Sequence, residues 1–420
     1  MILEYCIAIL NPKKMNSFIF TQKQAKSGKN TVKYRIDTLN SSLYLPIKLY
    51  ICTINIKMCN MNNLKIGNLI ARIPIIQGGM GVGISLSGLA SAVANEGGVG
   101  VISCAGIGLI YRNSAKDYME ACIIGLREEI RKAKEKSSGI IGVNIMMALT
   151  NFGDMVKTAI AEKADVIFAG AGLPMDLPKY RTPDCTTKLV PIVSSARAAR
   201  IICEKWKTLY DYLPDLVVVE GPKAGGHLGF KTVQIDDENF SIQKLIPEVV
   251  KEVAIFEEKY NQEIPVIAAG GIYTGEDIYE IMKLGAKGVQ IASRFVTTYE
   301  CDADIKFKET YIKAHDHDVE IIQSPVGMPG RALKGEFLEK VKLGLTKPKS
   351  CPYNCLHTCD YTKVPYCIIL ALYNAYQGKM DKGYAFAGSN AFLATKITSV
   401  KEIVDELISG FKTAENAAIA

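Results

Sequence analysis

Short apolar runs rich in β-branched residues alternate with longer amphipathic stretches from Met61 onward. Most of these runs are apolar throughout, without alternating polar positions, which is typical of parallel strands buried on both faces of a sheet. The pattern predicts eight strands, at residues 73–77 (IPIIQ), 99–103 (VGVIS), 140–146 (IIGVNIM), 165–169 (DVIFA), 189–193 (LVPIV), 216–220 (LVVVE), 265–269 (PVIAA) and 288–292 (GVQIA).

Helices are predicted between these strands. Residues 85–96 open with a serine that we expect to cap a helix, and 114–136 are strongly charged on one face. Residues 274–285 open with Thr274, carry two acidic residues in the first turn and stop at Gly285. Eight β–α units of this size predict an α/β fold, the TIM (β/α)8 barrel. A doubly wound open sheet is the alternative, but QGGMGVG is not a clean dinucleotide fingerprint.

The change of pattern at Met61 divides the chain into three segments. Residues 1–60 are rich in Lys, Asn, Ile and Tyr and show no clear period, so we expect an N-terminal extension that is not native or is disordered. An ordered arm or a partner-binding tail is the alternative. We expect residues 61–315 to form the barrel and residues 316–420 to form a smaller, mainly helical cap with a cysteine cluster.

Composition narrows the class of protein. Hydrophobic residues make up 48% and charged residues 22% of the chain, as in ordinary soluble domains. The net charge is +7, but the basic residues are spread out, so we expect no nucleic-acid partner. No apolar run reaches the ~18 residues of a membrane helix, and the first residues lack the features of a signal peptide. We therefore expect no membrane partner and a cytoplasmic location.

Glycines and polar residues follow the strands at the end where barrel enzymes hold their active sites. Glycine lets backbone N–H groups approach an anion, so the loops after the seventh and eighth strands predict a phosphate site; the alternative is a tight turn alone. The QGGM backbone can lie against a flat ring, which makes FMN a plausible ligand. Asn144 can bond its heteroatoms, unless it is a satisfied buried amide. These strand-end candidates are Gln77, Gly78, Gly79, Met80, Asn144, Gly270, Gly271, Ile272, Ala292 and Ser293.

The sixth strand leads into VVVEGPKAGGHLGF, which holds His227, one of only four histidines in the chain. A histidine framed by glycines at a strand end is a candidate acid or base near neutral pH. The alternative is an ordinary polar residue in a glycine-rich turn.

Five motifs in this order, IPIIQGGMGVGIS, GVNIM, EGPKAGGHLG, IPVIAAGGI and GAKGVQIASRF, resemble the nitronate monooxygenase family, formerly called 2-nitropropane dioxygenases. That family is similar to the flavin-dependent enoyl-acyl-carrier-protein reductases. The resemblance covers residues 64–300 well and implies a TIM barrel with one non-covalent FMN and His227 as the catalytic histidine. The FMN neighbours that it implies are Gly78, Met80, Asn144, Gly225, Gly226, Gly270, Gly271, Gln290 and Ser293.

The same resemblance implies oxidation of alkyl nitronates with O2 to carbonyl compounds and nitrite. The alternative is an FMN-dependent reductase that uses NAD(P)H on an enoyl thioester, and a third reading is a non-catalytic flavin-binding protein. A homodimer is a further expectation. Lys223 stands where many relatives carry glutamate, and a lysine near the mouth favours an anionic substrate such as a nitronate.

Four cysteines cluster in CPYNCLHTCDYTKVPYC, at Cys351, Cys355, Cys359 and Cys367. Thiolates are usual ligands of zinc and of iron–sulfur clusters. The spacing matches neither the paired C-x₂-C of zinc ribbons nor the ferredoxin run, so we expect reduced thiols without a metal, and a metal site is the alternative. Further on, the AFAGSNA stretch at residues 385–391 is a weaker candidate for contact with the flavin phosphate.

Overall fold

The computed structural model describes residues 5–7, 19–21 and 61–419. The chain divides into two units, residues 1–57 and 58–420. In the first, β1 (Tyr5–Ile7) and β2 (Ile19–Thr21) form an antiparallel pair. Apart from these two strands, the predicted extension of residues 1–60 lies outside the described residues, and its origin stays a prediction.

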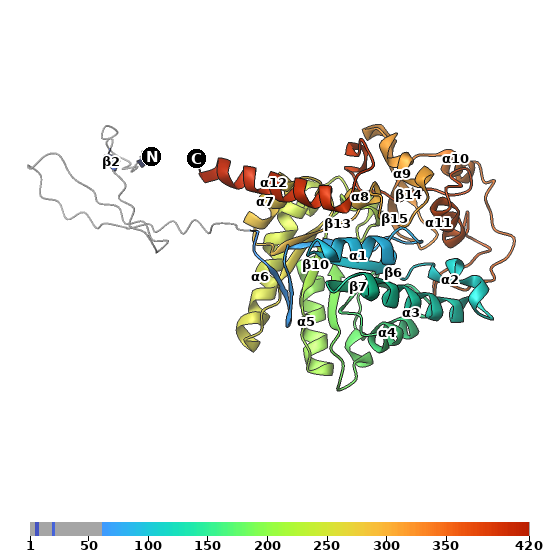
Figure 1. Cartoon of the computed structure of the whole chain (residues 1–420), viewed down its shortest axis with the longest axis horizontal. Helices are drawn as coiled ribbons and strands as arrows, with labels where there is room; N and C mark the ends of the chain where they lie inside the picture. Colours follow the sequence, from blue (N-terminus) through green and yellow to red (C-terminus); the bar gives the residue numbers. More distant parts are fainter. Residues whose placement is uncertain (1–4, 8–18, 22–60, 420) are drawn as a thin grey trace, which may run out of the picture. The chain divides into compact units, whose positions relative to one another are not determined.

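The second unit is built on a closed barrel of parallel strands, which confirms the predicted TIM barrel and excludes the open sheet (Figure 1). All eight predicted strands are present, and each pairs with its neighbour in chain order until the last closes on the first. The barrel strands are β5 (Ile75–Gln77), β6 (Val99–Ser103), β7 (Ile140–Met146), β8 (Val166–Gly170), β9 (Lys188–Val193), β10 (Val217–Glu220), β12 (Val266–Ala269) and β13 (Gly288–Ile291).

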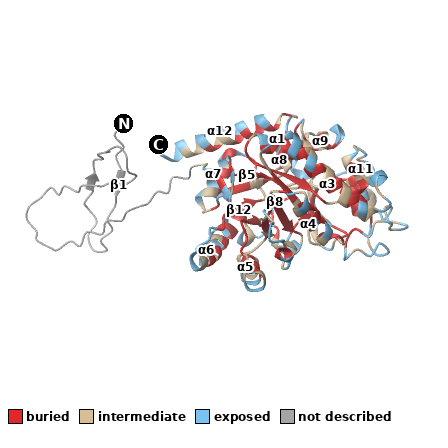
Figure 2. Ribbon diagram, turned by 60° about the horizontal axis from the view of Figure 1, so that its bottom comes forward, coloured by how far each residue is buried: buried red, intermediate tan, exposed pale blue. Residues whose placement is uncertain are grey.

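Burial on both faces explains why these strands read as continuous apolar runs. Inward side chains such as Val101, Phe168 and Val218 fill the barrel, and outward ones pack against the helices. The barrel strands are accordingly coloured as buried in Figure 2. A hairpin of β3 (Leu64–Ile66) and β4 (Leu69–Ala71) packs its apolar side chains into the same interior cluster. One end of the barrel is therefore filled by side chains, and chemistry is left to the other end.

Helices follow the barrel strands in the expected alternation, and three more lie between residues 305 and 376. They are α1 (Ser87–Asn95), α2 (Ile107–Ile110), α3 (Tyr118–Lys136), α4 (Phe152–Ala161), α5 (Ala196–Tyr210), α6 (Ile242–Tyr260), α7 (Gly275–Lys283), α8 (Ser293–Val296), α9 (Ile305–Ile312), α10 (Glu336–Lys342), α11 (Ile368–Tyr376) and α12 (Val400–Ile419). Thr274 caps α7 as predicted, because its hydroxyl accepts from the backbone N–H of Asp277. None of the helices in the described part of the chain has the length and apolarity to cross a membrane.

The predicted serine cap of the first helix is wrong. α1 begins at Ser87 after Leu86, and the carboxylate of Asp302 accepts from the N–H groups of Leu86 (2.8 Å), Gly88 (3.0 Å) and Leu89 (3.1 Å). Ser85 instead accepts from the N–H of Met80 at 2.8 Å and thereby fixes the loop after β5. A carboxylate more than two hundred positions away leaves no local signal, so pattern reasoning could not find this cap.

The last helix belongs to the barrel rather than to a cap. α12 packs against α7 and α1 (Figure 1), and Gly275 lets the two helices approach closely, since a Cβ there would lie 2.2 Å from the carbonyl oxygen of Leu407. The rings of Tyr279 and Phe411 meet edge to face at 5.5 Å. The final helix thus takes the position of the eighth outer helix of the barrel. The chain between α8 and α12, residues 297–399, is therefore an excursion inserted within the eighth β–α unit.

That excursion carries the cap elements. β14 (Val319–Gln323) and β15 (Pro329–Leu333) form a hairpin, and β15 also pairs with β11 (Gly226–His227) from the loop after β10. Residues 58–420 form one compact unit by their contacts, so a division of barrel and cap at residue 315 stays a prediction.

Candidate active site

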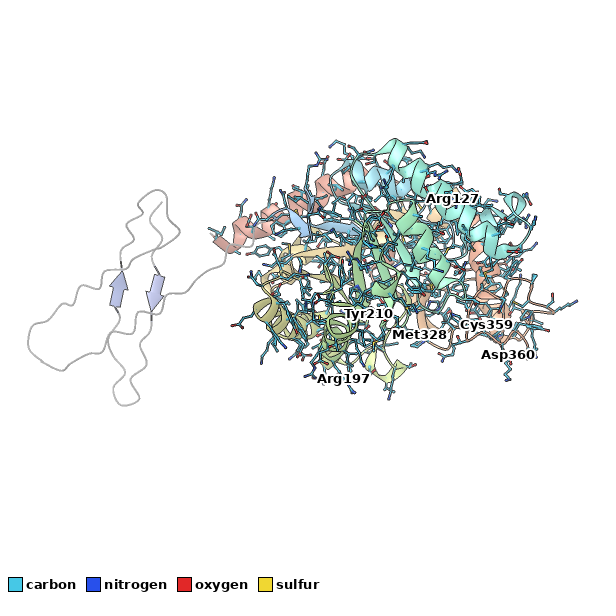
Figure 3. The ribbon with its side chains drawn as sticks, turned by 90° about the horizontal axis from the view of Figure 1, so that it is seen from below. Arg127, Arg197, Tyr210, Met328, Cys359 and Asp360 are labelled. Carbon is cyan, nitrogen blue, oxygen red and sulfur yellow. The ribbon has the colours of Figure 1, made fainter. Side chains whose placement is uncertain are left out.

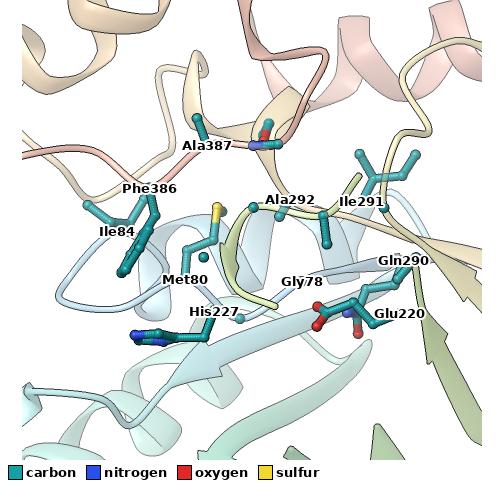
Figure 4. Close-up of a pocket in the computed structure, with 18 of the residues that line it drawn as sticks. Gly78, Met80, Ile84, Glu220, His227, Gln290, Ile291, Ala292, Phe386 and Ala387 are labelled. Atoms are coloured by element: carbon teal, nitrogen blue, oxygen red, sulfur yellow. The ribbon is translucent and has the colours of Figure 1, made fainter. Parts of the chain in front are cut away.

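A cavity of about 240 Å³ opens at the carboxyl ends of the barrel strands, where the sequence predicts the site. The barrel strands supply its floor, and the excursion between α8 and α12 supplies Phe386 and its neighbours on the other side (Figure 4). The predicted site residues that line this cavity are Gly78, Gly79, Met80, Asn144, Gly225, Gly226, His227, Gly270, Gly271, Ile272, Gln290, Ala292 and Ser293.

Gln77 is the predicted site residue that does not line the cavity. Its side chain is fully buried in the barrel wall, where the amide oxygen accepts from the N–H of Val101 at 3.0 Å and the amide nitrogen donates to the carbonyl of Gly78. Successive side chains of a strand point to opposite sides, so a strand-end position alone does not bring a side chain to the cavity. Gln77 ties β5 to β6 and supports the glycines that follow it.

His227 stands at one end of the cavity on β11. Its Nε2 lies 2.7 Å from the hydroxyl oxygen of Ser324, and its ring meets Phe386 edge to face at 5.0 Å (Figure 4). Burial lowers the pKa of His227 from 6.5 to about 4, so the imidazole is neutral at physiological pH. Nδ1 is the ring nitrogen without a partner among the described residues, and it is the one available to a ligand.

The loop before His227 is held from the cap side. The guanidinium of Arg331 on β15 is buried and donates to the carbonyl oxygens of Pro222 and Ala224, the latter at 2.9 Å. Burial lowers the pKa of Arg331, and the negative charge of Asp236 offsets only part of this effect. Two backbone pairings, Gly226 with Arg331 and His227 with Gly330, complete the clamp. His227 is therefore positioned by the β14–β15 hairpin as much as by its own strand.

Glycines form a cradle where β10, β12 and the 387–390 segment meet. A Cβ on Gly225 would lie 2.6 Å from the backbone of Ala387 and Gly388, and one on Gly270, whose φ is +96°, would lie 2.8 Å from the nitrogen of Ala224. Only glycine fits these two positions. The loops therefore meet backbone to backbone, a geometry that suits an anion held by N–H groups.

Hydrogen bonds between polar groups link the loops at this glycine cradle. The N–H of Gly388 donates to the hydroxyl of Ser293 at 2.8 Å, and the amide of Asn390 donates to the carbonyl of Gly271 at 2.9 Å. Gly388, Ser389 and Asn390 all line the cavity beside Gly271 and Ser293. The AFAGSNA stretch thus lies at the predicted phosphate loops, which the sequence offered only as a weaker candidate. Glycine backbone and hydroxyl groups make a donor set that fits a phosphate group.

Next to the glycine cradle, the backbone at Gly79 and the Asn144 amide form a flat part of the cavity wall. Gly79 sits against Asn144, since a Cβ on Gly79 would fall 2.3 Å from that of Asn144. No hydrogen bond joins the Asn144 amide to another described residue, so its polar atoms are available to the cavity. Backbone on one side and an amide on the other fit the ring of a flavin.

Glu220 is a titratable residue in the cavity wall, and the sequence analysis assigned it no role. It shares one row of the sheet with Ala269 and Gln290, and Figure 4 shows it with Gln290 at the opposite end of the cavity from His227. Burial raises the pKa of this carboxyl from 4.5 to about 7. Near neutral pH, Glu220 can therefore carry a proton and donate a hydrogen bond into the cavity.

The raised pKa of Glu220 predicts a pH effect on stability in the flavin-free protein. The native state binds more protons than the unfolded state between the two pKa values, so this stabilisation is complete below 4.5 and is lost as the pH rises through about 7. Glu220→Gln removes the effect. We expect the variant to match the wild type at about pH 5 and to exceed it in thermal unfolding temperature at about pH 8. A difference between the two proteins that stays constant with pH would contradict the assignment.

Sequence reasoning missed Ser324 and Arg331, and it offered Phe386 only within the weaker 385–391 candidate, as a neighbour of the phosphate rather than of His227. All three come from the excursion between α8 and α12 and touch His227 or its loop. Ser324 is 97 positions from His227, and serines and phenylalanines in a hairpin carry no motif. Only the pairing of β11 with β15 reveals them. Glu220 did carry a signal, as the acidic residue that ends the sixth strand.

Comparison with known proteins adds to this geometry. A family model described as Nitronate monooxygenase matches residues 62–410. The chain is 28% identical to a probable nitronate monooxygenase of Staphylococcus haemolyticus, over 84% of this chain and 98% of that protein. It is 29% identical, over 64% of this chain and 66% of the relative, to the (3aS,4S,5R,7aS)-5-hydroxy-7a-methyl-1-oxo-octahydro-1H-indene-4-carboxyl-CoA dehydrogenase of Mycobacterium tuberculosis. The solved structure of FabK from Thermotoga maritima is similar with a TM-score of 0.62 and 28% identity, over 82% of this chain and 94% of that one.

Proposed function

The chain belongs to the nitronate monooxygenase family, and we propose that it oxidises alkyl nitronates with O2 to carbonyl compounds and nitrite, with FMN as its cofactor. It is a flavin-dependent oxidoreductase. The observation that carries the proposal is the position of His227, which is neutral and clamped at one end of a cavity whose other parts fit a flavin phosphate and ring.

The cofactor assignment rests on the two features of the cavity that suit FMN. The backbone of Gly270, Gly271 and Gly388 with the Ser293 hydroxyl would hold the phosphate, and Asn144 with the backbone at Gly79 would face the ring. When bound, FMN supplies the electron acceptor for the substrate. The apolar floor of the barrel excludes water from beneath the ring position, because its interior is filled by side chains.

His227 acts in this proposal as a neutral hydrogen-bonding group. The Ser324 hydroxyl accepts from the N–H of Val326 at 3.3 Å, and in this proposal it donates its own hydrogen to Nε2 of His227. The imidazole then carries its proton on Nδ1 and donates it to an oxygen of the nitronate. A nitronate is already deprotonated, so binding needs an N–H donor at this position and no proton transfer to the ring. With a pKa of about 4, the ring keeps that form over the neutral range.

Lys223 is proposed to favour anionic substrates. It lines the cavity from the loop after β10, and its methylene groups lie against Gly271. Lys223→Glu reverses one charge at the mouth, so we expect the KM for propyl nitronate to rise about 5- to 20-fold at low salt, with kcat little changed. Lys231→Glu, in the same loop but outside the cavity lining, is the matched control. An unchanged KM in the Lys223 variant would remove this residue from substrate selection.

The test of the proposed function is steady-state turnover of propyl nitronate in air. We expect nitrite and the aldehyde to form together while O2 is consumed, and both to be lost when the flavin is removed. If purified holoenzyme with bound flavin yields neither product, the proposal is wrong.

The reductase alternative is kept because two relatives favour it. One is named for a carboxyl-CoA substrate, and the other is FabK. In that case the same His227 would face the thioester carbonyl, and NAD(P)H would supply the electrons. Consumption of NADH or NADPH on addition of an enoyl thioester, without nitrite formation from propyl nitronate, would favour the reductase.

Two further expectations accompany the proposed function. We propose a cytoplasmic location, supported by the cysteines within residues 61–419, which are free thiols. A homodimer stays a prediction that a sedimentation measurement can test.

A further inference from the structure

Apolar side chains close one side of the active-site cavity. Most of them come from the excursion, namely from α9, from α11 and from the segment around Phe386, and one comes from the loop after β5. We call this wall the apolar lobe; its six side chains are Ile84, Phe307, Tyr311, Leu372, Tyr384 and Phe386. Four of the six are buried and two are half-buried, so the lobe presents little of its surface to solvent.

The cysteine-bearing part of the excursion takes no part in the lobe. Figure 3 shows Cys359 and Asp360, from the segment between α10 and α11, at the outer edge of the barrel unit, and none of the four clustered cysteines lines the cavity. Among the residues that the structure describes, no three His, Cys, Asp or Glu side chains are placed to hold a metal ion. The expectation of reduced thiols without a metal stays a prediction, which elemental analysis of the purified protein can test.

Direct contacts join the members of the lobe. The ring centroids of Phe307 and Tyr311 lie 5.8 Å apart, and the Tyr311 hydroxyl donates to the carbonyl of Phe386. The ring of Phe386 meets that of Tyr384 edge to face at 5.0 Å. Leu372 packs into the same hydrophobic cluster as Tyr384 and Phe386. The lobe is therefore one continuous surface that links α9 to α11.

The polar atoms of the lobe side chains are already bonded within the protein. The hydroxyl of Tyr311 is bonded to the Phe386 carbonyl, and the Tyr366 hydroxyl donates to that of Tyr384 at 3.2 Å. A ligand group in the lobe therefore meets mainly hydrocarbon. A charged group placed there would lose its hydration without gaining a partner, which is costly.

The two charged side chains in the described cavity lining, Glu220 and Lys223, belong to other parts of the wall. Glu220 stands at the end of the cavity opposite His227 (Figure 4), and the methylene groups of Lys223 lie against Gly271 in the loop after β12. The cavity is thus divided between a polar, glycine-rich part on the barrel strands and an apolar part on the excursion.

The lobe begins where the reacting group of the substrate is proposed to bind. The ring of His227 meets that of Phe386 edge to face at 5.0 Å, and Figure 4 shows Ile84 at the same end of the cavity. A substrate oxygen that accepts from Nδ1 of His227 therefore brings the hydrocarbon part of the same molecule next to Phe386.

We propose that the apolar lobe binds the hydrocarbon part of the substrate and selects nitronates whose apolar group is longer than a propyl chain. The nitronate head group in this statement rests on the proposed function, whereas the preference for an apolar group follows from the cavity wall. Each CH2 group that moves from water into the lobe strengthens binding about three- to fourfold, until the lobe is full. Leu372 is placed to set the length, because it is a half-buried member of the lobe that α11 contributes.

Turnover of a series of primary alkyl nitronates by the holoenzyme tests this preference. We expect kcat/KM, measured as O2 consumption, to rise about three- to fourfold for each CH2 added from propyl to hexyl nitronate. A nitronate of hexyl length that ends in a carboxylate should lose about tenfold or more relative to hexyl nitronate. Values of kcat/KM that stay level or fall from propyl nitronate onward overturn the proposal.

Two variants of Leu372 locate the effect in the lobe. Leu372→Trp fills it, so the ratio of kcat/KM for hexyl nitronate to that for ethyl nitronate should fall about tenfold or more. Leu370→Trp, at an exposed position of the same helix outside the cavity lining, is the matched control and should keep the wild-type ratio. Leu372→Ala instead enlarges the lobe and should raise the ratio of octyl to hexyl nitronate. Wild-type ratios in both Leu372 variants would contradict the assignment.

Binding of linear alkyl carboxylates gives a readout that needs no turnover. They carry the same charge as a nitronate, and their dissociation constants can be followed by the absorbance of the bound flavin. We expect the constant to fall about three- to fourfold per CH2 from butyrate to octanoate, and this fall to be lost in Leu372→Trp. If that dependence appears in a protein that oxidises no nitronate, the lobe is supported and the proposed function fails. If nitronates are oxidised but neither kcat/KM nor carboxylate binding depends on chain length, the proposed function stands and the lobe proposal is overturned.

Discussion

Replacing His227 with alanine is expected to lower the turnover of propyl nitronate by about 100- to 10,000-fold and to leave the flavin bound. His227 offers Nδ1 to the cavity while Ser324 holds Nε2, so the change removes the group that is placed to contact the substrate. The glycine corner proposed for the phosphate contains neither His227 nor Ser324. Turnover per bound flavin, with the visible spectrum as the measure of cofactor content, separates the two effects.

Two further variants sharpen this result. Ser324→Ala should lower kcat less than His227→Ala, because it leaves the ring in place and removes only the partner that orients it. His315→Ala, on the surface, is the matched control and should match the wild type. Full activity in the His227 variant would show that this histidine is structural.

Replacing Gly225 with alanine is expected to expel the flavin. The added Cβ would lie 2.6 Å from the backbone carbon of Ala387 and from the nitrogen of Gly388, and backbone cannot move aside as a flexible side chain can. Pushing residues 387–388 away breaks the bond from Gly388 to Ser293 and widens the proposed phosphate corner. Overpacking of this kind costs about 1–3 kcal/mol, which corresponds to about 5- to 150-fold weaker binding of FMN if the strain falls on the bound form.

The measurement is the dissociation constant of FMN, obtained by fluorescence titration of protein stripped of flavin. Gly335→Ala is the control, because a Cβ there meets nothing within 4 Å and the backbone is extended. In the absence of flavin, Gly335→Ala should unfold at a temperature close to that of the wild type, whereas Gly225→Ala should unfold a few degrees lower, because its clash lies within the folded chain. If Gly225→Ala binds FMN as tightly as the wild type, the phosphate does not sit at this corner.

The barrel could be predicted because the same sequence pattern, an apolar run followed by glycines or polar residues, recurs along the chain. Each strand is buried on both faces, so its residues are apolar in succession, and glycines or polar residues follow at the same end of most strands. The site residues that lie directly on these strand ends, such as Asn144 and Gly270, could be found for the same reason. Gln77 was predicted wrongly to reach the cavity by the same reasoning. Side chains alternate in direction along a strand, and that of Gln77 points into the barrel wall.

The parts that could not be predicted depend on distant pairings. Ser324 and Phe386 reach His227 only because β15 pairs with β11. A strand as short as the two residues of β11 has no local sequence pattern that predicts it. Asp302 caps α1 in the same long-range manner. Residues 316–420 were expected as a whole to form the cap, and no local pattern shows that the apolar face of α12, which includes Leu407 and Phe411, packs on the barrel helices.

Anaerobic mixing of the flavin-loaded enzyme with propyl nitronate, followed in a stopped-flow spectrophotometer, separates the nitronate oxidase reaction from the reductase reaction. We expect rapid bleaching of the oxidised flavin by the nitronate and no comparable bleaching by NADH or NADPH, with the nitronate reaction lost in His227→Ala. Rapid bleaching by NADH or NADPH, together with no reaction of the nitronate, would contradict this expectation.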